Sequence, residues 1–221
     1  LHSAGRVLIA DGAHGAHLAF EQGRRGYAGV YADMWVESAH KSLPSLTQGA
    51  AVLLNDLSLE EKLKDGLSVF RTTSPSYPVM ASVEFGYKYV AANPQAVAAV
   101  KSAVNDFKAK WPDYRFYPSA DYTKLCLDCA PLAVDSRILA HKLEKSGVYC
   151  EFADGRYIVF YLSVATTAAH FRALAKALER ALKEKGVRGT YFRRAALPPP
   201  ERTYSYLYAL SRPYEYVSLD A

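Results

Sequence analysis

VLIADGAHGAHLAF (residues 7–20) and ADMWVESAHKSLPSLTQGAAVL (residues 32–53) are the two stretches that decide the fold class. Each begins with a short apolar run and continues into a polar segment that contains Gly or Ser. Residues 6–10 and 32–38 therefore predict two strands, the first of them buried, and the apolar run 49–55 predicts a third. Short strands with intervening loops and helical segments indicate an α/β sheet.

Chemically useful side chains follow the first two predicted strands. Asp11 ends the first strand and His14 lies three residues later, whereas Ser38, His40 and Lys41 follow the second. Open α/β sheets bind ligands at the carboxyl ends of their strands, so we expect a carboxylate and an amine to face one site. Taken singly, a strand-end Asp is more often a turn or cap residue, and a Lys is usually a surface residue.

Pyridoxal phosphate is the ligand whose chemistry needs this pair. Its aldehyde reacts with a lysine amine, and a carboxylate must keep its pyridine nitrogen protonated so that the ring can accept electrons. His14 and His17 have H-x-x-H spacing, but they lie in a glycine-bearing loop with no helix to align their rings, so we expect no metal site.

Farther along the chain, proline punctuates two helical patterns. Residues 58–69 predict a helix opened by a Ser58–Glu61 capping box. Helical patterns over residues 72–93 and 95–111 meet at Asn93-Pro94, and Trp111-Pro112 stops the second. The polar stretch 20–29 predicts a surface loop.

Residues 112–197 have a β-α-β-β-α order, which predicts a small α+β domain with helices on one face of an antiparallel sheet. Ala153-Asp154-Gly155 joins the last two strands as a hairpin, and Gly147 caps the first helix. We therefore divide the chain into residues 1–111, residues 112–197 and a Tyr-rich tail, 198–221. The predicted strands are 122–128, 148–152 and 156–163, and the helices 135–146 and 167–185.

The composition and charge of the chain argue against some classes of function. The net charge is +5, but no basic stripe interleaved with aromatic residues is present, and the densest basic cluster, 175–194, mixes signs as the solvated face of a helix does. Nucleic-acid binding is therefore not expected, and no apolar run is long enough to span a membrane. No secretory signal is visible, and the three cysteines cannot all pair, so we expect a cytoplasmic protein in which Cys126 and Cys129 are structural.

Three consecutive motifs resemble the Orn/Lys/Arg decarboxylase family of fold-type-I pyridoxal-phosphate enzymes. The stretches 7–20 and 32–53 are similar to its cofactor segment, and FRTTSPSYPVMASVE (70–84) follows at the same distance as in that family. GVYCEFAD (147–154) and the LPPPERTY (197–204) and YEYVSLDA (214–221) segments follow in the family's order. The resemblance spans essentially the whole chain. It implies the C-terminal part of a large α/β domain, followed by a small α+β domain.

The resemblance also assigns roles to individual residues. It implies that Lys41 bonds the cofactor aldehyde and that Asp11 partners the pyridine nitrogen. His40 or Lys41 would supply the proton at Cα. Further contacts implied are Ala13 with the ring, His14 with the ring hydroxyl and imine, Ser38 and His40 with the phosphate, and Thr73 and Ser74 with the phosphate across a subunit interface.

The implied activity is decarboxylation of a basic amino acid, arginine or lysine or else ornithine, to a polyamine-pathway amine by a homodimer with shared sites. An acid must then bind the substrate's cationic head group; Glu37, Glu151 and Asp154 are the candidates, although each fits a surface or turn residue as well. Relatives usually carry an acidic residue where this chain has Gly12, which we expect to loosen the cofactor loop.

Two alternatives stay open at the level of sequence. The chain begins at Leu1 and ends at Ala221, and it contains only three strand candidates for its large domain, so we expect it to be cut at both ends. It would then be a catalytically incomplete relative that needs a second chain carrying the missing N-terminal half. The other alternative is a different fold-type-I enzyme, such as an aminotransferase or C–S lyase, which would share Asp11 and Lys41.

Overall fold

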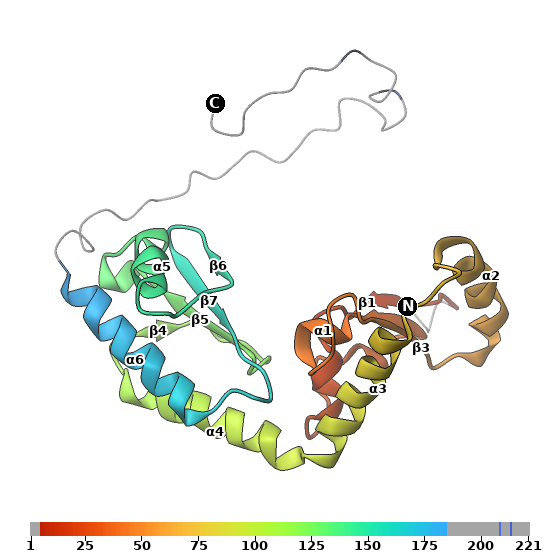
Figure 1. Cartoon of the computed structure of the whole chain (residues 1–221), viewed down its shortest axis with the longest axis horizontal. Helices are drawn as coiled ribbons and strands as arrows, with labels where there is room; N and C mark the ends of the chain where they lie inside the picture. The colour runs from red at the N-terminus through yellow and green to blue at the C-terminus, as the bar shows by residue number, and fades with distance from the viewer. Residues whose placement is uncertain (1–4, 185–207, 209–212, 214–221) are drawn as a thin grey trace.

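The chain folds into two lobes, each built on its own β-sheet, in a computed structural model that describes residues 5–184, 208 and 213 (Figure 1). The first sheet has the strand order β1-β2-β3 and the second β4-β5-β7-β6. Helices α3 and α4 lead the chain from the first lobe to the second (Figure 1). This mixed α/β architecture is the one expected from the sequence.

The first sheet brings the two predicted ligand-bearing strands together. β1 (Ile9–Asp11) pairs in parallel with β2 (Met34–Glu37), and β3 (Ala51–Leu54) pairs with β2 in antiparallel orientation. Asp11 lies opposite Val36 in the register. The predicted strands and the adjacency of the first two are confirmed, each strand being shorter than its apolar run.

One face of this sheet is covered and the other is largely bare. η2 (Ala16–Phe20) and the segment through η3 (Ala28–Val30) pack over Trp35 on the covered face. On the opposite face Ile9 is 64% exposed, and Val36 and Val52 are exposed as well. The prediction of a buried first strand was therefore wrong within the described residues, because only one side of it is packed.

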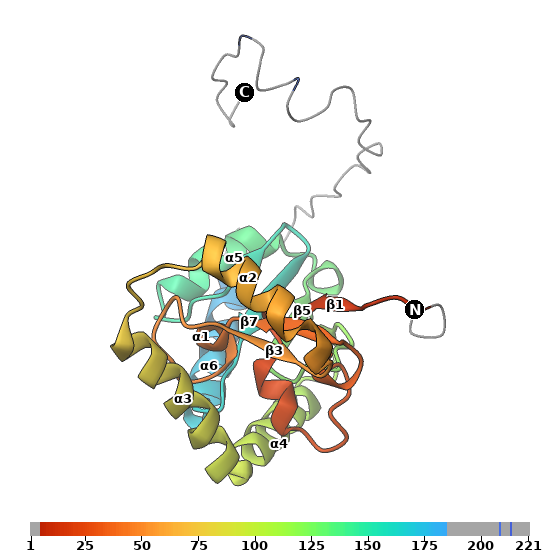
Figure 2. The ribbon, with the colours of Figure 1, turned by 90° about the vertical axis from the view of Figure 1, so that its right-hand side faces the viewer.

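A short helical pair follows the first sheet. η4 (Leu57–Leu59) leads directly into α2 (Glu60–Phe70), which lies on the outer side of the first sheet, away from the second lobe (Figure 2). The Asp56 side chain accepts the Ser58 N–H at the start of η4. The capping box expected at Ser58 and Glu61 was wrong, because the aspartate two residues earlier takes the role.

Proline and asparagine define the two long helices. α3 (Tyr77–Ala92) has Pro78 in its first turn and ends at Asn93, and α4 (Pro94–Lys110) begins at the next residue. Proline lacks an N–H and is tolerated in the first turn of a helix, where that donor has no partner inside the helix. The predicted break at Asn93-Pro94 is confirmed.

The second sheet is antiparallel throughout. The predicted hairpin is confirmed, because residues 154–156 connect the last two strands of this sheet in the chain. The first strand of this sheet was missed, since two residues with no flanking apolar run give no alternation signal. Its strands are β4 (Arg115–Phe116), β5 (Lys124–Asp128), β6 (Phe152–Ala153) and β7 (Tyr157–Tyr161).

Two capped helices pack with the second sheet. Asp135 caps α5 (Ser136–Glu144) by accepting the Arg137 N–H, and Thr167 caps α6 (Ala168–Lys183). η5 (Ala130–Leu132) precedes α5, so the predicted strand 122–128 stops before Cys129. Gly147 adopts φ +72° just past α5, as its predicted C-cap role requires.

Helix α4 packs with the C-terminal elements. It contacts both α3 and α6, and the ring centroids of Phe107 and Phe171 lie 5.4 Å apart. The predicted division at residue 111 stays a prediction, as do the limits of the small domain. Residues 185–197 and the tail, apart from Tyr208 and Pro213, lie outside the described residues. Within the described part, no helix has both the length and the apolarity to cross a bilayer.

Candidate cofactor site

The loop after β1 is held against β2 by backbone hydrogen bonds. Gly12 N–H donates to the Val36 carbonyl at 2.9 Å, and Ser38 N–H donates to the Ala13 carbonyl at 3.3 Å. The Asp11 carboxylate accepts the Ala13 N–H at 2.9 Å and remains exposed. The carboxyl ends of the two strands are thus tied together, and Asp11 opens to solvent beside them.

Gly12 lies close to β2 and to η3. A Cβ at this position would lie 3.1 Å from the Val36 carbonyl oxygen and 3.2 Å from the Ala28 Cβ. The expected loosening of the loop stays a prediction; in the structure the missing side chain lets the backbone approach β2 closely.

Lys41 lies in a single helical turn, α1 (Ala39–Ser42), directly after β2. Its N–H donates to the Ser38 carbonyl at 3.0 Å, and its side chain is exposed. The ring of the neighbouring His40 is held by a hydrogen bond, because its Nδ1 donates to the Gly49 carbonyl at 2.9 Å. A carbonyl only accepts, so Nδ1 carries the proton and Nε2 is left to face a ligand.

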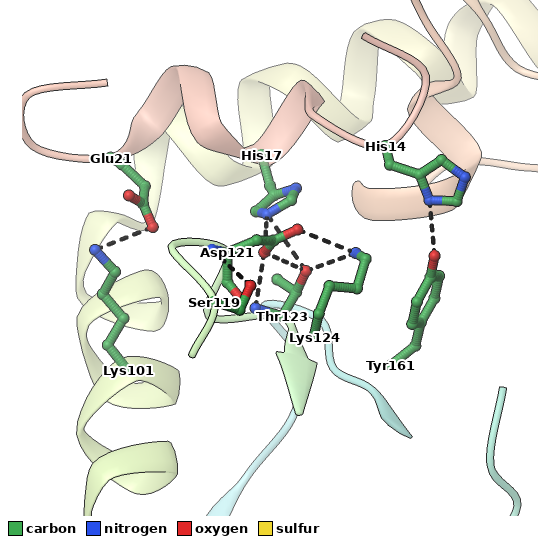
Figure 3. Close-up of polar contacts among 9 residues, drawn as sticks. All are labelled: His14, His17, Glu21, Lys101, Ser119, Asp121, Thr123, Lys124 and Tyr161. Carbon is green, nitrogen blue, oxygen red and sulfur yellow. Dashed lines mark hydrogen bonds and ion pairs between the residues drawn. The ribbon is translucent and has the colours of Figure 1, made fainter. Parts of the chain in front are cut away.

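His14 connects the two strand ends to the second lobe. Its Nε2 lies 3.4 Å from the Lys41 Nζ. Its Nδ1 lies 2.8 Å from the Tyr161 hydroxyl, as Figure 3 shows. Partial burial and the positive charges of Lys41 and Lys124 lower the pKa of His14, and the negative charge of Asp11 opposes them. The imidazole is therefore neutral near pH 7 and offers one donor and one acceptor.

A second contact between the lobes involves His17, which is fully buried. Its Nε2 lies 2.8 Å from the Asp121 carboxylate, which also accepts from the Thr123 hydroxyl at 2.6 Å (Figure 3). Burial tends to raise the pKa of Asp121, but hydrogen bonds from His17 and Thr123 and the charges of His17 and Lys124 lower it well below the usual range. His17 thus joins the two lobes.

The three acids that the sequence offered for binding the substrate lie in different environments. Glu37 is fully buried, with its carboxylate accepting from Trp35 Nε1 at 2.7 Å and from the Tyr87 hydroxyl. Asp154 caps a turn by accepting backbone N–H groups. Only Glu151 is exposed, and its charge acts on both His14 and Tyr161.

The buried carboxylate of Glu37 was not expected from the sequence. Its pairing with Tyr87 ties β2 to α3 and, together with burial, raises the pKa of that phenol. The alternation of β2 carries the signal that could have found it, because residues two apart share a face and Trp35 lies two before Glu37.

Thr73 and Ser74 lie in the exposed loop between α2 and α3. The Ser74 N–H donates to the Thr72 hydroxyl at 3.1 Å, and no hydrogen bond of the described residues joins this loop to Asp11 or Lys41. The structure therefore brings Asp11, Ala13, His14, Ser38, His40 and Lys41 together but not Thr73 and Ser74, whose implied role is in a partner subunit.

Comparison with known proteins supplies the family. Residues 1–110 match the model described as Orn/Lys/Arg decarboxylase, major domain. These residues belong to the Orn/Lys/Arg decarboxylase family. The uncharacterized protein YaaO of Bacillus subtilis (strain 168) is 26% identical over 174 residues, which are 73% of this chain and 36% of YaaO.

Solved structures show the same fold over both lobes. The E. coli constitutive lysine decarboxylase superposes with a TM-score of 0.67 at 17% identity, covering 78% of this chain and 32% of that one. The E. coli cysteine desulfurase CsdA superposes with a TM-score of 0.62 at 20% identity, covering 82% of this chain and 53% of that one. The fold is that of fold-type-I pyridoxal-phosphate enzymes, and the chain spans about a third of the decarboxylase and of YaaO.

Proposed function

We propose that this chain is the lysine-bearing part of a pyridoxal-phosphate-dependent decarboxylase of a basic amino acid. The observation that carries the proposal is the convergence of Asp11, His14 and Lys41 at the ends of two adjacent parallel strands. An amine, a carboxylate and a neutral imidazole fit this cofactor chemically. When bound, the cofactor supplies an aldehyde for the amine and a ring that accepts the electrons of the broken Cα–carboxylate bond.

Each residue of the site has a proposed task. The Lys41 amine holds the cofactor through its aldehyde carbon, and the exposed Asp11 carboxylate keeps the pyridine nitrogen protonated. His40 Nε2, left free by the bond from Nδ1 to Gly49, donates to the phosphate when the ring is protonated. The remaining proposed contacts are Ala13 with the ring, His14 with its hydroxyl, Ser38 with the phosphate, and Thr73 and Ser74 with the phosphate of a partner subunit's cofactor.

For the substrate we propose arginine, lysine or ornithine, with Glu151 as the acid that binds the cationic head group. Glu37 is buried against Trp35 and Tyr87, and Asp154 is occupied by turn hydrogen bonds, whereas Glu151 is exposed and acts on His14. A carboxylate binds a guanidinium or ammonium through charge-assisted hydrogen bonds. The product would be a polyamine-pathway amine.

We propose further that additional polypeptide covers the bare face of the first sheet. Val7, Ile9 and Phe70 line an apolar hollow of about 380 Å³ between β1 and α2. Parallel sheets are normally covered on both faces. The segment could belong to a longer chain or to a second polypeptide, and a homodimer with shared sites is part of the same proposal. The described cysteines are all free, which supports the proposed cytoplasmic location.

Another fold-type-I reaction is the second candidate, favoured by the superposition of the cysteine desulfurase, whose TM-score of 0.62 is close to the 0.67 of the lysine decarboxylase. A catalytically incomplete relative is the third, and the exposure of Lys41 supports it. The completed enzyme distinguishes them. Release of carbon dioxide and an amine supports a decarboxylase, formation of a keto acid supports an aminotransferase, and release of sulfur from cysteine supports a C–S lyase. The absence of all these products supports an incomplete relative.

Covalent trapping tests the cofactor assignment on this chain. Pyridoxal phosphate is added, the mixture is reduced with borohydride, and the modified peptide is identified by mass spectrometry. We expect the label on Lys41, its loss in Lys41→Ala and its retention in Lys88→Ala, which removes an exposed lysine of α3. Label distributed over surface lysines, unchanged in Lys41→Ala, would contradict the assignment.

A further inference from the structure

Tyr161 ends β7 in the second sheet, yet its hydroxyl reaches the first lobe. The hydroxyl lies 2.8 Å from His14 Nδ1, and the two rings meet edge to face with centroids 5.9 Å apart. The ammonium of Lys124 lies 4.0 Å from the centroid of the Tyr161 ring. Nothing in the sequence assigned a role to this tyrosine, which is 147 residues from its histidine partner.

Lys41, His14 and Tyr161 form an unbranched series of hydrogen-bonded side chains, of which Figure 3 shows the contact between His14 and Tyr161. While Lys41 is an ammonium, His14 Nε2 must accept from it, so Nδ1 carries the proton and donates to the Tyr161 oxygen. Once Lys41 is a neutral amine, Nε2–H donates to its lone pair and the Tyr161 hydroxyl donates to Nδ1. Each state of the lysine thus selects one tautomer of the histidine.

We propose that Tyr161 is a positioning residue that orients His14 and gives Lys41, whose side chain also reaches solvent, a relay for the proton that it must lose before its amine can react. The inference rests on the proposed function of Lys41, because only the neutral amine is a nucleophile. One proton moves from Lys41 Nζ to His14 Nε2, one from His14 Nδ1 to the Tyr161 oxygen, and one from that hydroxyl to water. After these transfers none of the three side chains carries a net charge, and the only change is that the Lys41 ammonium has become an amine.

The surrounding charges suit this transfer. Burial and the charges of Lys41 and Lys124 lower the pKa of His14, while Asp11 and Glu151 oppose them, so the ring stays neutral and able to exchange tautomers. Burial and the charges of Glu151 and Asp121 raise the pKa of Tyr161, so the phenol keeps its proton and can both donate and accept. Tyr161 is also 37% exposed, which gives its hydroxyl access to water.

Nitrogen NMR of the ¹⁵N-labelled chain tests the positioning role without any cofactor. The two ring nitrogens of His14, assigned with His14→Asn, report its tautomer ratio at a pH where Lys41 is protonated. We expect Tyr161→Phe to shift the ratio away from the Nδ1–H form by about fivefold, the effect of losing one net hydrogen bond. Tyr149→Phe is the matched control, because it removes a hydroxyl from a 74%-exposed tyrosine that lines a pocket of the second lobe together with Tyr161. An unchanged ratio in Tyr161→Phe would overturn the proposal.

Trapping of Lys41 by pyridoxal phosphate supplies a second readout. We expect Tyr161→Phe to slow the trapping at neutral pH by about fivefold. At alkaline pH, where hydroxide can take the proton without the relay, the variant and the wild type should be trapped at the same rate. Equal trapping rates in Tyr161→Phe and the wild type at every pH would also overturn the proposal. If the wild type is not trapped at Lys41 at all, although Tyr161→Phe still shifts the tautomer ratio, the proposed function fails and the orientation of His14 by Tyr161 stands. Thermal unfolding verifies that both phenylalanine variants are folded.

Discussion

Gly49 holds the helical turn that contains Lys41, although it carries no side chain. Its carbonyl accepts both the backbone N–H and the ring Nδ1 of His40, so one peptide group fixes the backbone and the ring of the residue before the lysine. A Cβ at this position would lie 2.5 Å from Ser45 Oγ and 2.7 Å from Val83 Cγ2. Glycine is thus required here by packing rather than by backbone conformation.

Gly49→Ala is predicted to lower the free energy of unfolding by about 1 to 3 kcal/mol, the usual cost of overpacking a filled site. Urea denaturation followed by circular dichroism measures the change. Gly66→Ala is the matched control, because nothing lies within 4 Å of its added methyl group in α2. That control should gain up to about 1 kcal/mol, since alanine is the better helix former. An unaltered midpoint in Gly49→Ala would show that α3 can move aside.

At the scale of elements, η2 and β5 are joined by a buried histidine. His17 Nδ1 has no hydrogen-bond partner in the described structure, so Nε2 is the ring nitrogen that donates to Asp121. The carboxylate, in turn, is held charged by donors on both sides of the interface.

Because of this contact, part of the free energy of unfolding depends on pH. The folded-state pKa of Asp121 lies below its usual 3.8, so its contribution is complete above about pH 4 and is lost as the pH falls further. Asp121→Asn should unfold about 1 kcal/mol more easily at pH 7, the difference between a charged and a neutral hydrogen bond. Its free energy of unfolding should also fall less steeply than that of the wild type below pH 4.

Urea titrations between pH 7 and pH 2.5 measure both effects, and Asp113→Asn, in an exposed turn, is the control. Parallel pH profiles of Asp121→Asn and the wild type would refute the role assigned to this carboxylate.

The same elements show what the sequence could and could not predict. Proline and asparagine mark the ends of α3 and α4 chemically, and Asp11 and Lys41 follow apolar runs, so the helix break and the strand pair were predictable. β4 has two residues, too few for a pattern. The contacts of His17 with Asp121 and of His14 with Tyr161 depend on how the two lobes pack, which local periodicity does not encode.

At the scale of the whole molecule, one face of the first sheet is apolar and largely exposed. Its register places Ile9 and Met34 on one face, and both line the hollow closed on its outer edge by α2. Phe70, at the end of that helix, is 90% exposed. Exposed apolar surface of this kind marks an interaction site. The chain spans about a third of the length of the E. coli lysine decarboxylase, which leaves a large part of that fold outside it.

The hollow beside Phe70 should therefore make the isolated chain associate with itself and bind an apolar dye. Phe70→Lys is predicted to reduce both effects and to change the free energy of unfolding by no more than about 0.5 kcal/mol, because the ring makes little contact within the chain. Light scattering after size-exclusion chromatography and the fluorescence of an anilinonaphthalene sulfonate dye measure the two effects. Phe85→Lys adds the same charge at an exposed ring of α3 outside the hollow and should leave both unchanged. The proposal would be contradicted if the wild-type chain remained monomeric at high concentration and did not raise the fluorescence of the dye. The exposed face would then bind no apolar partner, and the additional polypeptide would have no physical basis.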